Sequence, residues 1–121
     1  MLQIEKIISL EKSLEQVKGT LCSYYSYCTK EGMIVKAIPV RNIILEVNSL
    51  LDSIISLRNT EKIPYYIADK LAKQIKALVE KLNSWEVSPL FTPEQLSEII
   101  SYSTFLEMEN NHDTRRNRSN D

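Results

Sequence analysis

Glycine, proline, histidine and cysteine are all scarce in this chain of 121 residues, which has 2 Gly, 4 Pro, 1 His and 2 Cys. So few turn-forming residues leave little room for a turn-rich β fold or for a glycine-rich loop that binds phosphate. The only histidine, His112, lies in a polar segment, so a metal site built from His and Cys cannot be assembled. We therefore expect no metal and no cofactor.

Reactive groups are equally sparse. Cys22 and Cys28 are six positions apart, so on one helix they point to different faces and cannot form a disulfide with each other. We expect both to be packing residues, because a Cys–His nucleophile would need His112 to fold back onto one of them. Paired carboxylates occur only at surface helix positions. We expect no catalytic residues, no small-molecule substrate and hence no enzyme.

Long apolar runs and a strong net charge are also missing. No apolar run approaches the roughly 18 residues that span a bilayer, and acidic residues interrupt the opening segment MLQIEKIISLEKSLEQ, unlike a signal peptide. We expect a cytoplasmic location and no membrane partner. The formal net charge is −1, so any contact with nucleic acid must come from a local basic patch.

The chain does contain apolar residues at alternating spacings of three and four, the pattern of an amphipathic helix. This pattern predicts helices over residues 2–29, 38–57, 64–85 and 93–108. It is strongest in the second segment, where six residues form the seam: Val40, Ile43, Val47, Leu50, Ile54 and Leu57. Three further residues widen this seam so that neighbours can cover it from two sides: Ile44, Leu51 and Ile55.

Start and stop signals agree with this division. Gly32 follows the first segment, where a left-handed residue commonly ends a helix. Pro39 and Pro64 are predicted at the first position of the second and third helices, where the missing N–H costs nothing. Thr92 and Gln95 form a capping box before the fourth helix. Four helices with short connections predict an all-α fold, an antiparallel bundle of about four helices.

The length fits a single domain, which we place at residues 1–109. Residues 110–121 read NNHDTRRNRSND and are polar without periodicity, so we predict a disordered tail. Three arginines there offer weak phosphate contacts, although a solubilising role is the preferred interpretation: Arg115, Arg116 and Arg118.

Arg41 is the one charge that stands out. Just after Pro39 it would lie in the first turn of the second helix, where the helix dipole disfavours a cation. Free N–H groups at a helix start favour an anion, and Lys36 adds positive charge nearby, so a bound phosphate or carboxylate would explain Arg41. The rival explanation is an internal ion pair with a nearby carboxylate: Glu31, Glu46 or Asp52.

Two other features permit contact with RNA. Lysines occupy the polar arc of the third helix, which is usually just a solvated face: Lys70, Lys73, Lys76 and Lys81. Tyr24, Tyr25 and Tyr27 could stack on bases, but Tyr24 belongs to the apolar seam of the first helix and is expected in the core.

Residues 40–50 and 101–107 resemble parts of the small subunit of type III CRISPR effector complexes of the Csm type. Val40-Arg41-Asn42-Ile43, followed by Glu46-Val47-Asn48 and Leu50, is similar to the signature helix of that family. Residues 101–107, which read SYSTFLE, are similar to its final helix. The Thr or Ser that the family usually has before the arginine, and its arginine late in the third helix, are both missing here.

This resemblance implies a non-catalytic subunit in antiviral defence. It would stack with copies of itself and with other effector subunits, and it would contact the backbone of the guide RNA and target RNA through Arg41. Four lysines are further candidates by position: Lys36, Lys73, Lys76 and Lys81. The alternative is a helical protein-interaction adaptor or chaperone that does not bind nucleic acid and holds a partner through apolar seams.

Overall fold

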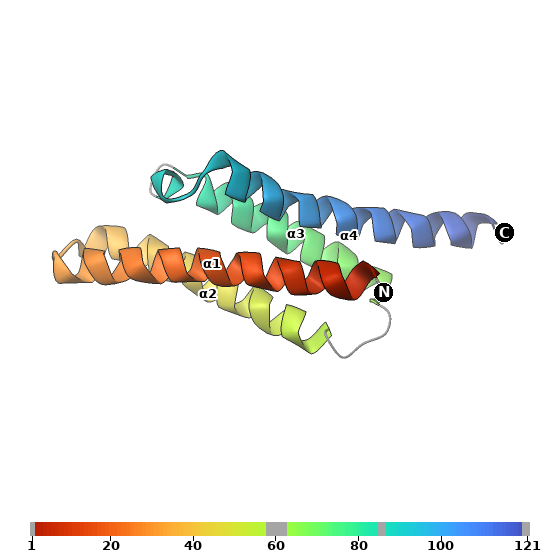
Figure 1. Ribbon diagram of the computed structural model, residues 1–121, viewed down its shortest axis with the longest axis horizontal. Helices are drawn as coiled ribbons and strands as arrows, with labels where there is room; N and C mark the ends of the chain where they lie inside the picture. The colour runs from red at the N-terminus through yellow and green to blue at the C-terminus, as the bar shows by residue number, and fades with distance from the viewer. Residues whose placement is uncertain (1, 58–62, 85–86, 120–121) are drawn as a thin grey trace.

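In the part of the chain that the computed structural model describes, four α-helices follow one another: α1 (Leu2–Lys30), α2 (Ile34–Leu57), α3 (Tyr65–Leu82) and α4 (Pro93–Ser119). A 3-10 turn, η1 (Ser88–Leu90), precedes α4. The backbone is described for residues 2–57, 63–84 and 87–119, and side chains for 5–57, 63–84, 87 and 89–108. These residues contain no strand. Consecutive helices run in opposite directions (Figure 1). The fold is the predicted all-α antiparallel bundle.

The end of α1 is set by a left-handed glycine, as the sequence predicts. Gly32 has a φ of 72°, which glycine adopts at no steric cost. The N–H of Gly32 donates to the carbonyl of Thr29 (3.2 Å), and the N–H of Met33 donates to the carbonyl of Cys28 (2.8 Å). Together these bonds satisfy carbonyls that the helix end leaves open, and they direct the chain into α2.

The start of α2 lies four residues earlier than predicted, at Ile34, so Pro39 is inside the helix. The prediction of Pro39 at the first helical position is therefore wrong. The N–H of Ala37 already donates to the carbonyl of Met33 (3.0 Å), which shows that the helix forms as soon as α1 has ended. Pro39 only removes the hydrogen bond to the carbonyl of Val35, in an exposed first turn that water can reach.

The starts of α3 and α4 lie close to their predicted positions. Pro64 is the N-cap residue of α3 rather than its first helical residue, and α3 ends at Leu82; the predicted end at residue 85 lies outside the described residues. The N–H of Thr92 donates to Oε1 of Gln95 (2.9 Å), and the N–H of Gln95 donates to Oγ1 of Thr92 (3.1 Å). The predicted capping box is confirmed.

The far end of α4 continues past the predicted limit near Met108 to Ser119. Its last turns project beyond the other helices (Figure 1). Leu106 is the last described side chain of α4 that is buried. The segment predicted as a tail therefore stays outside the bundle, and its backbone is helical as far as Ser119.

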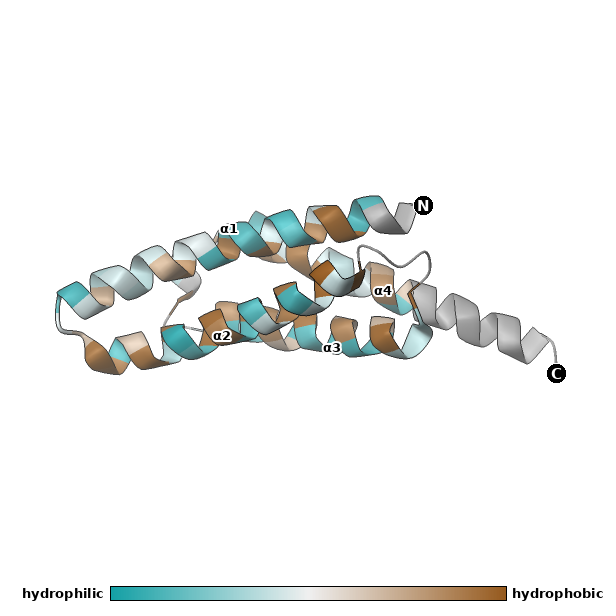
Figure 2. Ribbon diagram, turned by 90° about the horizontal axis from the view of Figure 1, so that it is seen from below, coloured by the Kyte–Doolittle hydropathy of each residue, from teal (hydrophilic) through white to brown (hydrophobic). Residues whose placement is uncertain are grey.

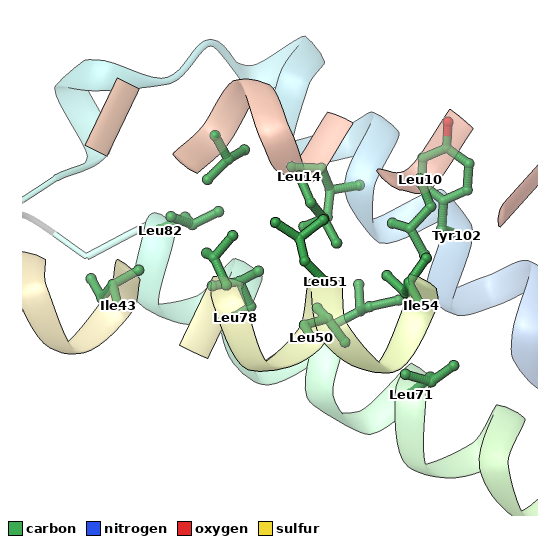
Figure 3. Close-up of a cluster of buried hydrophobic side chains, with 14 of the residues drawn as sticks. Leu10, Leu14, Ile43, Leu50, Leu51, Ile54, Leu71, Leu78, Leu82 and Tyr102 are labelled. Carbon is green, nitrogen blue, oxygen red and sulfur yellow. The ribbon is translucent and has the colours of Figure 1, made fainter. Parts of the chain in front are cut away.

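One apolar core fills the space between the helices. Side chains from all four helices point into it (Figure 3): Leu10, Leu14, Ile43, Leu50, Leu51, Ile54, Leu71, Leu78, Leu82 and Tyr102. Burying each large aliphatic side chain stabilises the fold by about 1.5–3 kcal/mol. Of the three residues expected to widen the α2 seam, Leu51 is buried, Ile44 is half-buried and Ile55 is exposed.

The bundle consists of two hairpins. Packing is most extensive between α1 and α2 and between α3 and α4, while smaller contacts of α2 with α3 and of α1 with α4 join the hairpins. The α1–α2 hairpin extends beyond the α3–α4 hairpin at one end (Figures 1 and 2). This free end exposes several large apolar side chains: Tyr27, Ile34, Val35 and Ile38. In the described part of the chain, no helix combines the length and apolar character needed to cross a membrane.

Candidate functional site

Two of the α3 lysines that were candidates for RNA binding are paired with carboxylates. The Nζ of Lys73 lies 3.0 Å from Oδ2 of Asp69, one turn earlier on the same helix. Lys76 forms an ion pair with Glu107 of α4. Such exposed pairs contribute little to stability. A phosphate group would nevertheless have to compete with a carboxylate for each of these cations.

Lys81 lies on the opposite flank of α3 and pairs with Glu46 of α2. At 3.6 residues per turn, Lys76 and Lys81 are about 140° apart around the helix. The first ties α3 to α4 and the second ties α3 to α2. The three α3 lysines therefore do not form one basic face. Two of the carboxylates that pair with these lysines belong to α2 and α4. The sequence of the α3 segment alone therefore cannot predict these pairs.

Arg41 and Lys36 are both exposed on α2. Because α2 begins at Ile34, Arg41 lies well beyond the first turn, where the effect of the helix dipole has faded. The argument that Arg41 is a cation at the wrong end of a dipole is therefore wrong. Lys36, expected in a connection, lies in the first turn of α2. The two residues are about 140° apart around the helix and do not share a face.

The guanidinium of Arg41 has no carboxylate partner among the described residues. None of the three carboxylates considered from the sequence forms an ion pair with it: Glu31, Glu46 and Asp52. Glu46 pairs with Lys81 instead. The five N–H donors of the Arg41 side chain are thus available to a partner outside the chain.

Apolar residues surround Arg41 on the outer face of α2. Ile34, Ile38 and Leu45 are 65%, 54% and 53% exposed. Their spacing of four, seven and eleven from the first places them with Arg41 on one side of the helix. Val47, which is fully buried, is about 200° around the helix from Leu45. The same spacing continues to the end of α2, and we call these seven residues the outer stripe: Ile34, Ile38, Arg41, Leu45, Asn48, Asp52 and Ile55.

The aromatic cluster is divided between packing and solvent. Tyr24 is half-buried and stacks on Tyr27 with 6.3 Å between the ring centroids. Burial raises the pKa of the Tyr24 hydroxyl, and its hydrogen bond with Cys28 raises it further, so Tyr24 stays neutral at physiological pH. Cys28 is buried as expected, but Cys22 is exposed and both thiols are free. The expectation that both cysteines are packing residues is therefore wrong for Cys22.

An open groove of about 280 Å³ lies between α2 and α3, lined by Glu46, Ser49, Leu50, Gln74, Ala77 and Leu78. The one ionisable residue of this lining is Glu46, which is held by Lys81. The groove therefore offers no free base to activate a nucleophile. Among the residues that the structure describes, no three or more His, Cys, Asp or Glu side chains are grouped so as to hold a metal ion.

Packing explains the apolar residues behind the resemblance to the CRISPR small subunit. In the C-terminal segment Tyr102 is buried in the core, and the Nζ of Lys6 lies 6.0 Å from the ring centroid of Phe105. In the α2 segment Val40 is also buried. Packing does not explain Arg41, which faces solvent and has no ion pair in the described part of the chain; Asn42, Glu46, Ser101 and Thr104 are exposed as well.

No family model matches the sequence, and no curated protein or solved structure matches it either. The function therefore has to be argued from the surfaces of the chain itself. Two features remain as candidates: the outer stripe of α2, and the scattered cations of α2 and α3.

Proposed function

We propose that this chain is a helical protein-interaction module that contacts another protein through the outer stripe of α2. The observation that supports it is the exposure of Ile38 and Leu45 around Arg41, on the side of α2 that faces away from the core. An arginine among apolar side chains is typical of the centre of protein interfaces. Covering such side chains releases about 25 cal/mol for each Å² of apolar surface removed from water.

The arrangement of the cations on α2 and α3 is less favourable for binding RNA through a basic patch. RNA-backbone contact needs several cations on one surface. Lys73, Lys76 and Lys81 each pair with a carboxylate, and Arg41 and Lys36 lie on different sides of α2. A protein partner needs only the stripe that is already exposed.

Site-specific photo-crosslinking in native cells tests this proposal. Benzoylphenylalanine in place of Leu45 lies in the outer stripe, and we expect it to form covalent adducts with protein. The matched control is the same residue in place of Lys12, which is exposed on α1, and it should give few adducts. A result in which Leu45 and Lys12 give the same adducts, or in which Leu45 gives none with protein, contradicts the proposal.

A second candidate function is that of a small subunit of a type III CRISPR effector complex. It is favoured by the resemblance of the α2 segment and by the exposed, unpaired Arg41. In this role the chain would stack with copies of itself and other subunits, and would contact the guide and target RNA backbone. Arg41 and Lys36 would bind phosphate directly, whereas the α3 lysines would exchange carboxylate for phosphate. As a subunit of such a complex, the chain would act in the cytoplasm.

The salt dependence of RNA binding tests the second candidate. If the chain binds the RNA backbone, the affinity for an RNA duplex should fall with rising salt, with a log–log slope of about −0.9 for each phosphate that is neutralised. Replacing Arg41, Lys73 and Lys76 together with Ala should weaken binding and flatten this slope. Thermal melts of the variant check that the fold is intact. If the affinity for RNA and its salt dependence are unchanged in this variant, the chain does not contact RNA through these residues.

A further inference from the structure

We propose that the protein bound by the outer stripe is a second copy of this chain, with α2 of one copy packed antiparallel against α2 of the other. This inference depends on the proposed function of the outer stripe and names its partner. The interface would be isologous, so that the same residues of both copies meet across a two-fold axis.

The outer stripe has the spacing of a coiled-coil seam. From Ile38 to Ile55 its members follow at intervals of three, four, three, four and three residues: Ile38, Arg41, Leu45, Asn48, Asp52 and Ile55. This alternation keeps the six side chains on one side of α2 over about 26 Å. Within this range Ile38, Leu45 and Ile55 are 54%, 53% and 45% exposed. Arg41 and Asp52 are exposed as well, whereas Asn48 is half-buried.

Antiparallel pairing matches this seam with itself. A two-fold axis between positions 46 and 47 brings together residues at equal distances on either side of it. Ile38 of one copy then faces Ile55 of the other, and Arg41 faces Asp52. Next to the axis, Leu45 faces Asn48. Each pairing occurs twice, so apolar residues meet at both ends and opposite charges meet between them.

Charge selects the antiparallel arrangement over a parallel one. In the antiparallel pair each Arg41 meets an Asp52, whereas a parallel pair would place Arg41 against Arg41 and Asp52 against Asp52. Neither residue forms an ion pair within the described chain, so both are available to the second copy.

One flank of the stripe leaves room for another helix. On the side toward α3 the flanking side chains are short, polar and exposed: Asn42, Ser49 and Ser56. Short side chains permit two helix axes to approach to about 8–10 Å. A single helix pair buries less than the roughly 1,200–2,000 Å² of a standard stable interface. We therefore expect a weak dimer, with a dissociation constant in the range of about 1–50 µM.

Sedimentation equilibrium of the purified full chain tests the dimer. Arg41→Asp and Asp52→Arg each place like charges opposite one another twice in every dimer, so each should raise the dissociation constant at least about 100-fold. The double variant recreates both pairs with their order reversed and should dimerise again. An equimolar mixture of the two single variants should form a heterodimer, because each chain then supplies the charge that the other needs.

Lys12→Asp is the matched control, since it makes the same change of charge on the exposed face of α1. It should leave the dimer intact, and circular dichroism should show unchanged helix content in all variants. Monomers alone up to roughly 500 µM, ten times the upper limit of the expected range, overturn the inference, as does a dimer that both single variants leave unchanged. If Leu45 crosslinks to a different protein while the chain stays monomeric, the self-association fails and the interaction function stands. If neither adduct nor dimer is found, both fail.

Discussion

At the scale of single residues, the two glycines show that conformation decides what a glycine contributes. Gly19 lies inside α1, where glycine is less favourable than alanine. Gly32 has a φ of 72°, where alanine is strained. A Cβ added at either position would meet nothing within 4 Å. Steric crowding by neighbours therefore plays no part, and only the backbone conformation distinguishes the two.

The same substitution should consequently have opposite effects at the two glycines. We expect Gly19→Ala to raise the free energy of unfolding by about 0.5–1 kcal/mol. Gly32→Ala should lower it by about 1–2 kcal/mol, because the left-handed conformation penalises a side chain. Urea unfolding followed by circular dichroism measures both changes. If both substitutions changed the free energy of unfolding in the same direction, the result would contradict the left-handed turn at Gly32.

Arg41 is a candidate site residue in both the sequence and the structure, but for different physical reasons. The sequence argument for Arg41 depends on a helix that starts at Pro39. The structure moves that start to Ile34, and the electrostatic argument then disappears. The spacing of Ile34, Ile38 and Leu45 is the sequence signal of the outer stripe. The predicted helix excludes Ile34, so the prediction does not contain the whole stripe.

At the scale of elements, Pro39 is the clearest conflict between local preference and the fold. Proline inside a helix removes a hydrogen bond and costs about 3 kcal/mol relative to alanine. Part of that cost is offset because proline also restricts the unfolded chain. α2 forms nevertheless, since Gly32 ends α1 and the buried face of α2 is held by the core.

Replacing Pro39 should therefore strengthen α2. We expect Pro39→Ala to raise the free energy of unfolding by about 1–2 kcal/mol, because it restores the N–H that can donate to the carbonyl of Val35. Pro64→Ala is the control, since Pro64 is an N-cap residue that interrupts no helix. It should change stability by less than about 0.5 kcal/mol. Equal effects at Pro39 and Pro64 would argue against a helix that begins at Ile34.

The capping box of α4 allows a second test at this scale. The Thr92 hydroxyl accepts from the N–H of Gln95 at 3.1 Å, so it satisfies a donor that the helix leaves open. Thr92→Ala should lower the free energy of unfolding by about 1 kcal/mol. Ser97→Ala, an exposed change one turn later on the same helix, should have little effect. Thermal melts of the two variants measure both changes in stability. If Thr92→Ala loses as little stability as Ser97→Ala, the cap contributes nothing.

At the scale of the whole molecule, the pattern of apolar residues predicts more of the fold than of the surface. The seams of four helices identify the core, because burial in a bundle follows helical spacing within each segment. The ion pairs of Lys76 and Lys81 bring in carboxylates from α4 and α2. Such contacts depend on how helices are placed against one another, and no single segment contains that information. For the same reason the predicted basic face is not found as one surface.

Neighbouring residues on α2 separate the core from the proposed interface. Ile54 is fully buried, whereas Ile55 is 45% exposed. Ile54→Ala should lower the free energy of unfolding by about 2–5 kcal/mol, because it leaves a cavity between the helices. Ile55→Ala should change the unfolding of the dilute, monomeric chain by less than about 1 kcal/mol. At concentrations where copies associate, however, Ile55→Ala should weaken the dimer, since it removes both apolar contacts with Ile38. Urea unfolding at two protein concentrations measures both effects. If the unsubstituted chain is more stable at the higher concentration and the Ile55→Ala variant is equally stable at both, the seam contributes to association. If the free energy of unfolding of neither chain depends on concentration, α2 does not join two copies.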